Sequence, residues 1–232
     1  MKPLNNRDFL QLWEQGSSLH PLDRGLLALQ AALPDTPHDA LADWPLGRRN
    51  QALVELRCAC FGTRLRAWIA CERCPEKLEF DLDGRALAQG AEDRTETIVV
   101  DSQTFRLPTS RDIAGVVHES DPDRAVVRLV EACRVARDPS DATMADLEEV
   151  SRQLSLADPM AEILIHLRCP TCGCENSPPL DIGSFLWTEI EVRAKRLLHE
   201  IHVLACAYGW TEQAVLALSE HRRAAYLEMV RG

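Results

Sequence analysis

The amino-acid sequence predicts an α+β fold that is mainly helical, with a small β element split between two distant parts of the chain. Three observations predict this fold. Two Cys-x-x-Cys pairs lie far apart, at Cys71 and Cys74 and at Cys169 and Cys172. Alternating apolar and polar residues, which are typical of strands, lead into and out of each pair. Most of the remaining chain carries apolar residues at the spacing of amphipathic helices.

The two cysteine pairs predict one metal site. Two thiols three positions apart on a tight turn can both face the same ion. Four thiolates suit a closed, tetrahedral, structural Zn²⁺ site, so the predicted ligands are Cys71, Cys74, Cys169 and Cys172. The halves of a compact zinc ribbon lie roughly 15–20 residues apart, whereas here a whole region stands between them. The metal is therefore expected to join the parts of a split four-cysteine, zinc-ribbon-like element.

Residues 1–62 are predicted to form an N-terminal helical region. Asn6 is a candidate N-cap for its first helix. Pro21 suits the first turn of a second helix, which should stop before Pro34. A further helix is expected over residues 47–60, with an apolar stripe on one side and its arginines on the other.

Residues 63–108 and 161–183 are predicted to hold the strands. In each segment a strand, a cysteine turn and a second strand follow one another, which predicts a zinc-knuckle hairpin. The first segment also contains a second alternating pair of runs, which predicts a β-hairpin that turns at Asp101 and Ser102. We expect the two knuckle hairpins to share one small sheet.

Residues 109–160 form the inserted region, and the sequence predicts that it is helical. Natural breaks before Pro122 and Pro159 divide it. The expected helices cover residues 110–117, 122–137 and 144–154.

The C-terminal region, residues 184–232, carries the clearest helical pattern. Apolar residues recur every three or four positions from Leu186 to Tyr208, as in the seam of a coiled coil. We expect Ser184 to cap this helix and Gly209 to end it. Arg196 and Glu200 should pair on an exposed side of it, four positions apart. Two shorter helices, each opened by a hydroxyl N-cap, are expected over residues 211–218 and 219–230.

The cysteine count indicates a reducing compartment. The chain has nine cysteines, an odd number, and its N-terminal sequence shows no apolar core of a secretory signal. This favours reduced thiols in the cytoplasm over a disulfide framework. Cys133 and Cys206 have helical, apolar surroundings and are expected to be small buried residues. The roles of Cys58, Cys60 and Cys174 stay open, including a second site or Cys174 as a replacement ligand.

Charge and motifs disfavour several classes of function. The formal net charge of −10 opposes a nucleic-acid backbone, and no run approaches the ~20 apolar residues that cross a bilayer. Gly-rich phosphate loops, GxSxG elbows, kinase signatures and a thioredoxin-like context for either cysteine pair are missing. His199 and His202 stand three positions apart, not four as in zinc proteases, which favours a surface or packing role over a zinc hydrolase. We predict no catalytic residue, small-molecule substrate, nucleic-acid partner or membrane insertion.

Longer strings of the sequence resemble one protein family. They are Leu-Trp-Glu-Gln-Gly at 12–16, His-Pro-Leu-Asp-Arg at 20–24, Gly-Arg-Arg-Asn at 47–50, both cysteine pairs, Phe-Leu-Trp-Thr-Glu-Ile at 185–190, and the C-terminal string from His202 through Tyr-Gly-Trp at 208–210 to Arg222 and Arg223. Over nearly the whole chain they resemble bacterial members of the T-even phage baseplate protein family, which accompany contractile tails and extracellular contractile injection systems. The C-terminal string is the most specific part.

The resemblance implies a non-enzymatic structural or assembly role. The expected partners are other baseplate or hub proteins of a contractile tail, met in the bacterial cytoplasm or within the assembled tail particle. One departure concerns the metal site. The first pair reads Cys-Glu-Arg-Cys-Pro-Glu, without the Cys-Pro-x-Cys-Gly form that the second pair keeps, so the first half is expected to bind less tightly.

Large aromatic residues near helix ends are candidate anchors for a partner. Trp187, Trp210 and Tyr226 are expected to form or support the partner surface with the apolar seam, because such side chains are costly to expose and commonly anchor interfaces. Filling the core is the other interpretation. The alternative function is a zinc-ribbon nucleic-acid-binding or transcriptional accessory protein, which predicts salt-dependent retention on DNA.

Overall fold

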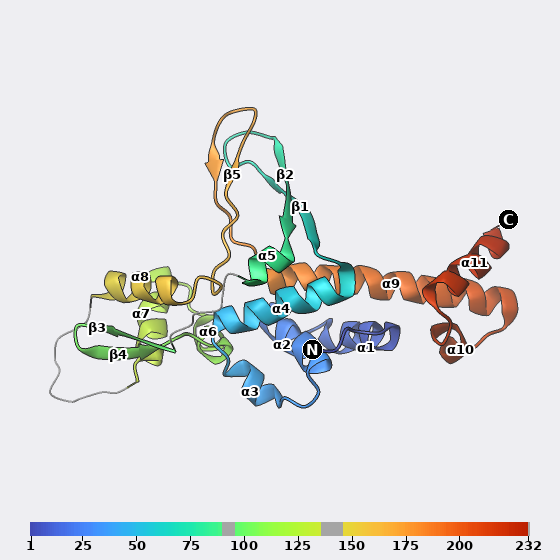
Figure 1. The fold of residues 1–232 in the computed structure, drawn as a ribbon, viewed down its shortest axis with the longest axis horizontal. Helices are drawn as coiled ribbons and strands as arrows, with labels where there is room; N and C mark the ends of the chain where they lie inside the picture. The colour runs from blue at the N-terminus through green and yellow to red at the C-terminus, as the bar shows by residue number, and fades with distance from the viewer. Residues whose placement is uncertain (90–95, 136–145, 232) are drawn as a thin grey trace.

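The computed structural model describes residues 1–89, 96–135 and 146–231, and the described chain is mainly helical with small antiparallel sheets. A long helix, α9 (Ile182–Tyr208), runs along the centre of an elongated body. The inserted region lies at one end of this body and the last two helices lie at the other (Figure 1). An arm built from the two cysteine hairpins projects from the middle, so the predicted metal ligands lie away from the helical body.

The N-terminal region forms four helices before the first strand. They are α1 (Asn6–Gly16), α2 (Pro21–Ala32), α3 (His38–Ala42) and α4 (Leu46–Phe61). The N-cap of α1 is Asn5 and not Asn6 as the sequence predicted. The Asn5 side chain accepts hydrogen bonds from the backbone N–H groups of Arg7 and Asp8, while the Asp8 carboxylate accepts from the Asn5 N–H. This reciprocal capping box fixes the start of the helix.

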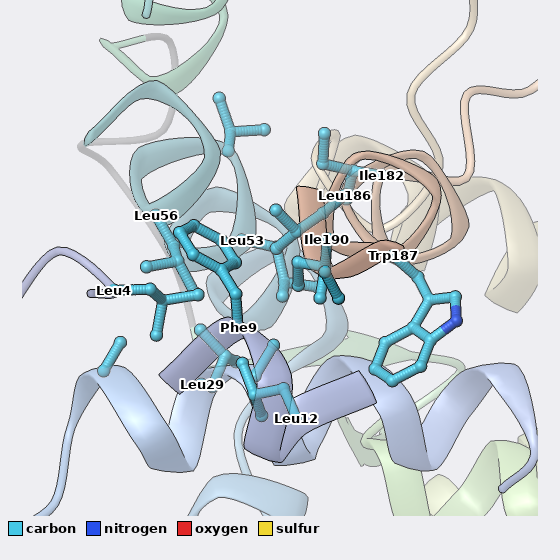
Figure 2. Close-up of a cluster of buried hydrophobic side chains, with 14 of the residues drawn as sticks. Leu4, Phe9, Leu12, Leu29, Leu53, Leu56, Ile182, Leu186, Trp187 and Ile190 are labelled. Atoms are coloured by element: carbon cyan, nitrogen blue, oxygen red, sulfur yellow. The ribbon is translucent and has the colours of Figure 1, made fainter. Parts of the chain in front are cut away.

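The main core lies where α9 packs on α1, α2 and α4 (Figure 2). The helices contribute leucines and isoleucines that are removed from water, among them Leu12, Leu29, Leu53 and Ile190. The apolar seam predicted along α9 is therefore confirmed up to Leu204. Its last member, Tyr208, is exposed because the seam runs past the end of the N-terminal helices.

Capping at the two ends of α9 follows one prediction and corrects another. Gly209 ends the helix in the left-handed conformation, with φ of +68°, as the sequence predicted. At the start, Ser184 is not the cap. It donates both its backbone N–H and its hydroxyl to the Asp181 carboxylate, and Asp181 is the N-cap. An ionised carboxylate at this position also interacts favourably with the positive end of the helix dipole.

The chain after α9 folds back along it in two helices. These are α10 (Glu212–Leu216) and α11 (Glu220–Arg231). The hydroxyls of Thr211 and Ser219 accept backbone hydrogen bonds at their starts, which confirms the predicted hydroxyl caps. The predicted pair of Arg196 and Glu200 forms at 2.9 Å, but Glu200 is buried, because α11 covers it.

In the described part of the chain the strands pair in three separate two-stranded sheets. The pairs are β1 (Arg64–Ala70) with β2 (Lys77–Asp83), β3 (Thr97–Val100) with β4 (Gln103–Arg106), and β5 (Leu167–Arg168) with β6 (Glu175–Asn176). The expectation that the two knuckle hairpins share a sheet is wrong. Beyond β5 and β6, Pro178 and Pro179 have no N–H groups to donate to the opposite segment. The second hairpin therefore continues there only through isolated hydrogen bonds, such as the one from the Ile165 N–H to the Pro178 carbonyl at 3.0 Å.

The hairpin of β3 and β4 turns where the sequence predicted. Asp101 and Ser102 have φ values of +49° and +63°, the two positive angles that a tight two-residue hairpin turn requires. A short helix that the sequence analysis missed, α5 (Gly84–Gln89), follows β2. It is too short for a helical period to stand out in the sequence.

The inserted region packs around a second, smaller core. Its helices are α6 (Ser110–Val116), α7 (Pro122–Cys133) and α8 (Leu147–Ala157). Phe105, Val130, Val150 and neighbours fill the space between them and the hairpin of β3 and β4. The helix predicted over residues 122–137 ends earlier, because Arg134 is extended and bridges Phe105. The predicted limits at 137 and 144 lie outside the described residues, and Asp146 caps α8.

Candidate metal centre

The two cysteine turns have the same backbone closure. In the first, the Cys71 N–H donates to the Glu76 carbonyl at 2.9 Å; in the second, the Cys169 N–H donates to the Cys174 carbonyl at 2.8 Å. The second turn has an additional bond from the Gly173 N–H to the Cys169 carbonyl, with Gly173 at φ of +70°. Pro75 stands at the corresponding place in the first turn and has no N–H to donate, so the first turn lacks this backbone bond.

The structure brings the four predicted ligands together. The sulfur atoms of Cys71, Cys74, Cys169 and Cys172 all lie within 4.8 Å of one another. Two separations cross between the turns: 3.7 Å from Cys71 to Cys172 and 3.6 Å from Cys74 to Cys169. Four sulfurs at about 2.3 Å from one tetrahedral ion would lie about 3.8 Å apart. The cluster is therefore close enough to hold one metal ion.

A small apolar cluster surrounds the thiols at the tip of the arm. Cys169 and Cys71 are buried together with Leu78, and Ile69 and Leu167 pack against them. Cys172 is exposed, and Cys74 is partly exposed. One side of the centre is thus dry and the other faces solvent.

The pKa values of two clustered thiols shift in opposite directions. The backbone N–H of Arg73 donates to the Cys71 sulfur and lowers the pKa of that thiol to about 6. For Cys74, the Glu76 N–H acts to lower the pKa, but burial and the neighbouring thiols outweigh it and raise the pKa to about 12. Because a metal binds thiolates, its binding would displace protons from the cluster.

Side chains also connect the two turns directly. The Thr171 hydroxyl donates to Glu76 at 2.8 Å on the exposed side. On the buried side, the side-chain oxygen Oδ1 of Asn176 accepts a hydrogen bond from the Glu72 backbone N–H at 3.0 Å. The sequence alone did not reveal this contact of Asn176. Its place in a short alternating run carries no signal that its side chain crosses to the other turn.

The remaining cysteines lie outside this cluster. Cys174 is partly buried and its thiol contacts the Glu175 carbonyl, so the structure does not place it among the four clustered sulfurs. Cys58 and Cys60 are partly buried on α4, and burial raises the pKa of both thiols. Cys133 is buried, as predicted, and burial raises its pKa to about 11. The prediction that Cys206 is buried is wrong, because it lies on the solvent side of α9.

The two histidines of the His-Glu-Ile-His string do not form a metal site within the described residues. His199 and His202 are both exposed on α9, and His202 lies 3.9 Å from the Cys206 sulfur. Among the described side chains, the four clustered cysteines are the one group of three or more potential ligands that lie close enough to share an ion.

The three candidate partner-binding aromatics lie in two different environments. Trp187 is only 6% exposed and packs in the main core, with the Arg24 guanidinium 4.9 Å from its ring centre. Trp210 and Tyr226 form a partly exposed cluster with Tyr208, which we call the C-terminal aromatic cluster. Trp210 stacks on Tyr208 at 4.8 Å between ring centres and meets the edge of Tyr226, also at 4.8 Å. Trp187 is thus too buried to be a main contact of a partner, and it can support a partner surface only by packing under it.

Comparisons of the chain with models of protein families, with curated proteins and with solved structures find no match. The family resemblance drawn from the sequence motifs therefore stays a prediction. No helix in the described ranges combines the length and the apolar character needed to span a membrane.

Proposed function

We propose that the chain is a non-enzymatic structural or assembly protein that acts through protein–protein contacts on a zinc-stapled scaffold. The observation that carries the proposal is the four-sulfur cluster, whose ligands come from two distant hairpins. Such a centre fixes the shape of the arm. With four thiolates bound, it has no open coordination position at which a substrate could react.

Zinc is the metal that suits this donor set best. Soft thiolates in a tetrahedral arrangement select Zn²⁺ or iron–sulfur chemistry, and we propose Zn²⁺ because it is the usual ion of closed four-cysteine structural sites. The distances of 3.6 and 3.7 Å between opposite turns agree with that spacing. A cytoplasmic location, where thiols stay reduced, belongs to the same proposal.

The assignment to a contractile-tail or injection-system baseplate rests on the sequence motifs. Two structural features are compatible with an assembly role. The body is elongated around α9, and its C-terminal end carries the aromatic cluster beside the exposed apolar residues Met229 and Val230. Aromatic side chains of this kind commonly anchor protein partners. We therefore place the partner surface at the C-terminal aromatic cluster.

The charges on α9 and α11 argue against the nucleic-acid alternative. Basic residues that recur in this part of the sequence are engaged with acidic neighbours: Arg193 with Glu220 at 2.9 Å, Lys195 with Glu191 at 2.6 Å, and both Arg196 and Arg223 with Glu200. A phosphate backbone needs cations that are free to replace its counterions. The described parts of α9 and α11 offer few such free cations.

Three measurements test the proposal. The purified protein should contain one zinc ion, and the cobalt-substituted protein should show the absorption of four thiolates. The proposal predicts that sheath, tube and spike proteins are encoded beside this protein, and tagged protein co-expressed with them should co-purify with at least one. Iron in place of zinc, a neighbourhood without such genes, or salt-dependent retention on DNA would contradict the respective part of the proposal.

A further inference from the structure

Asn176 is a polar side chain buried beside the sulfur cluster. It lies on β6 in the second hairpin and is 1% exposed. Burial of an amide without hydrogen bonds is costly, so a buried asparagine is expected to have its polar atoms occupied. Its neighbours belong to both cysteine turns, which lie far apart in the sequence.

Three contacts occupy the Asn176 amide. Its Oδ1 accepts from the Glu72 N–H at 3.0 Å, and its Nδ2 donates to the Cys174 carbonyl at 3.1 Å. The same Nδ2 lies 3.9 Å from the Cys71 sulfur, within reach of an N–H···S hydrogen bond. These contacts fix the orientation of the amide. A flipped amide would place a donor against the Glu72 N–H and an acceptor against the Cys174 carbonyl.

The contact with Glu72 supports the first of the two turns. Glu72 directly follows Cys71, so holding its N–H also holds the Cys71 backbone in place. Pro75 cannot supply the backbone bond that Gly173 supplies in the second turn. Asn176 therefore fixes the first turn against the second from the buried side.

The contact with Cys71 bears on the charge of the centre. Four thiolates around one Zn²⁺ carry a net charge of −2, and N–H donors aimed at sulfur stabilise that charge. Cys71 already accepts one such donor, the Arg73 N–H at 3.5 Å. The Asn176 amide approaches the same sulfur from the other hairpin.

We propose that Asn176 is a positioning residue of the metal centre, which aligns the two cysteine turns and donates an N–H to the Cys71 thiolate. The inference rests on the metal binding proposed above. It assigns a role in metal affinity to a residue that is not itself a ligand.

Asn176→Leu tests this role, because leucine has the same branched arrangement of side-chain heavy atoms as asparagine but cannot hydrogen-bond. Zinc affinity, measured by competition with a chromogenic chelator, should fall about 10–100-fold, as is typical when a residue that orients metal ligands is lost. The matched control is Thr171→Val. It removes the other side-chain bond between the turns, from the Thr171 hydroxyl to Glu76, without touching a sulfur. Because this bond is exposed, its loss should lower zinc affinity much less than the loss of Asn176 does.

A spectroscopic readout separates hydrogen bonding to sulfur from general support of the fold. In the cobalt-substituted protein, the sulfur-to-metal charge-transfer band should move to lower energy in Asn176→Leu, because Cys71 loses a donor that stabilises its lone pairs. The band should not move in Thr171→Val. A change in melting temperature alone would not produce this difference.

The inference is overturned if folded Asn176→Leu binds zinc as tightly as the wild type and its cobalt band stays in place. If this variant does not fold, Asn176→Ala carries the same two measurements, since it removes the donor without adding bulk. Wild-type protein that takes up no zinc or cobalt would instead contradict the metal centre, and with it the basis of this inference. The two failures are thus distinguishable.

Discussion

Arg223 on α11 and Glu200 on α9 form an ion pair that is almost fully excluded from water. The Arg223 Nε lies 3.0 Å from the Glu200 Oε2, and the two side chains are 1% and 6% exposed. Arg223 also donates to the Leu218 carbonyl at 2.6 Å, while Arg196 reaches Glu200 from the solvent side. This pair fastens the C-terminal helix to the long helix α9.

Glu200→Leu should destabilise the protein by roughly 3–5 kcal/mol, because it leaves the Arg223 charge buried without a partner. The loss is measured as the change in unfolding free energy in urea. The double variant Glu200→Leu with Arg223→Met should recover most of it, since an apolar pair of similar volume can replace a buried ion pair. Arg196→Ala, which removes only the exposed partner, should cost about 1 kcal/mol or less. Equal losses in the single and double variants would contradict this account.

Asp112→Asn should weaken the inserted region at neutral pH and not at low pH. The Asp112 carboxylate accepts two hydrogen bonds from Arg106, at 2.6 and 2.8 Å, and two from Thr109. Burial raises its pKa, but these bonds outweigh burial and hold the pKa below its ordinary value. The stabilisation is therefore fully present above the unfolded pKa of about 3.9 and is lost as the pH falls through the lower folded pKa.

The expected cost of Asp112→Asn at pH 7 is about 1.5–3 kcal/mol, the usual contribution of hydrogen bonds to a charged group. Urea unfolding at a series of pH values between 7 and 2 should show the two proteins converging at the acidic end. Glu149→Gln is the matched control. The Arg152 guanidinium lowers the pKa of Glu149 to about 2, but that carboxylate lies on an exposed helix surface, so its loss should change stability little. A cost for Asp112→Asn that does not depend on pH would rule out the charge as its cause.

The local features of the fold could be predicted from the sequence, because short-range patterns determine them. Two pairs of thiols, each three positions apart, predicted a shared metal site, and the structure places all four sulfurs together. The turn at Asp101 and Ser102 and the end of α9 at Gly209 follow from the residues themselves. The helical seam of α9 follows from its period, since a buried stripe repeats every three or four residues.

The features that the sequence did not reveal depend on contacts between distant segments. Glu200 was expected on an exposed side, because its own helix shows no sign that α11 folds back over it. Asn176 could not be recognised, because its partner Glu72 belongs to the other hairpin. The two hairpins were expected to share a sheet, although they meet through side chains and sulfurs. In each case the structure depends on contacts between distant segments, and local sequence patterns carry no information about such contacts.

Trp210→Ala should reduce both stability and partner binding if the C-terminal aromatic cluster anchors a partner. The ring loses its contacts with Tyr208 and Tyr226, each worth about 0.5–1.5 kcal/mol, so unfolding should become easier by about 1–3 kcal/mol. Melting temperature and co-purification of the proposed baseplate partners should be measured on the same preparation. The partner loss should persist at temperatures where the variant is fully folded.

The control for Trp210→Ala is Trp68→Ala, on the distant arm. Trp68 is 54% exposed and lies beside Lys77, with the ammonium 4.2 Å from its ring centre. It matches Trp210 in chemistry but not in position, so partner binding should survive its removal. If Trp210→Ala lowers the melting temperature and leaves co-purification intact, the cluster only fastens α11 to α9. If Trp68→Ala alone abolishes co-purification, the partner surface lies on the arm.

Removal of the metal should loosen the tip of the arm and leave its base folded. The tip has only a small apolar cluster of its own around Cys71, Leu78 and Cys169. The base of the first hairpin, by contrast, inserts Leu65 and Phe80 into the main core. Hydrogen exchange followed by mass spectrometry should therefore show faster exchange near the cysteine turns after chelation, with little change near the base and in α9.

Cys169→Ser should reproduce the effect of chelation, because a hydroxyl is a far poorer zinc ligand than a thiolate. Zinc content should fall below one ion per chain, and the tip should exchange as in the chelated wild type. Cys174→Ser is the matched control: its thiol lies in the same turn but outside the four-sulfur cluster, and the bond from Asn176 reaches only its backbone carbonyl. It should keep the metal and the slow exchange. A Cys169→Ser protein with full zinc content and a protected tip would show that the sulfurs of the two turns are close without sharing an ion.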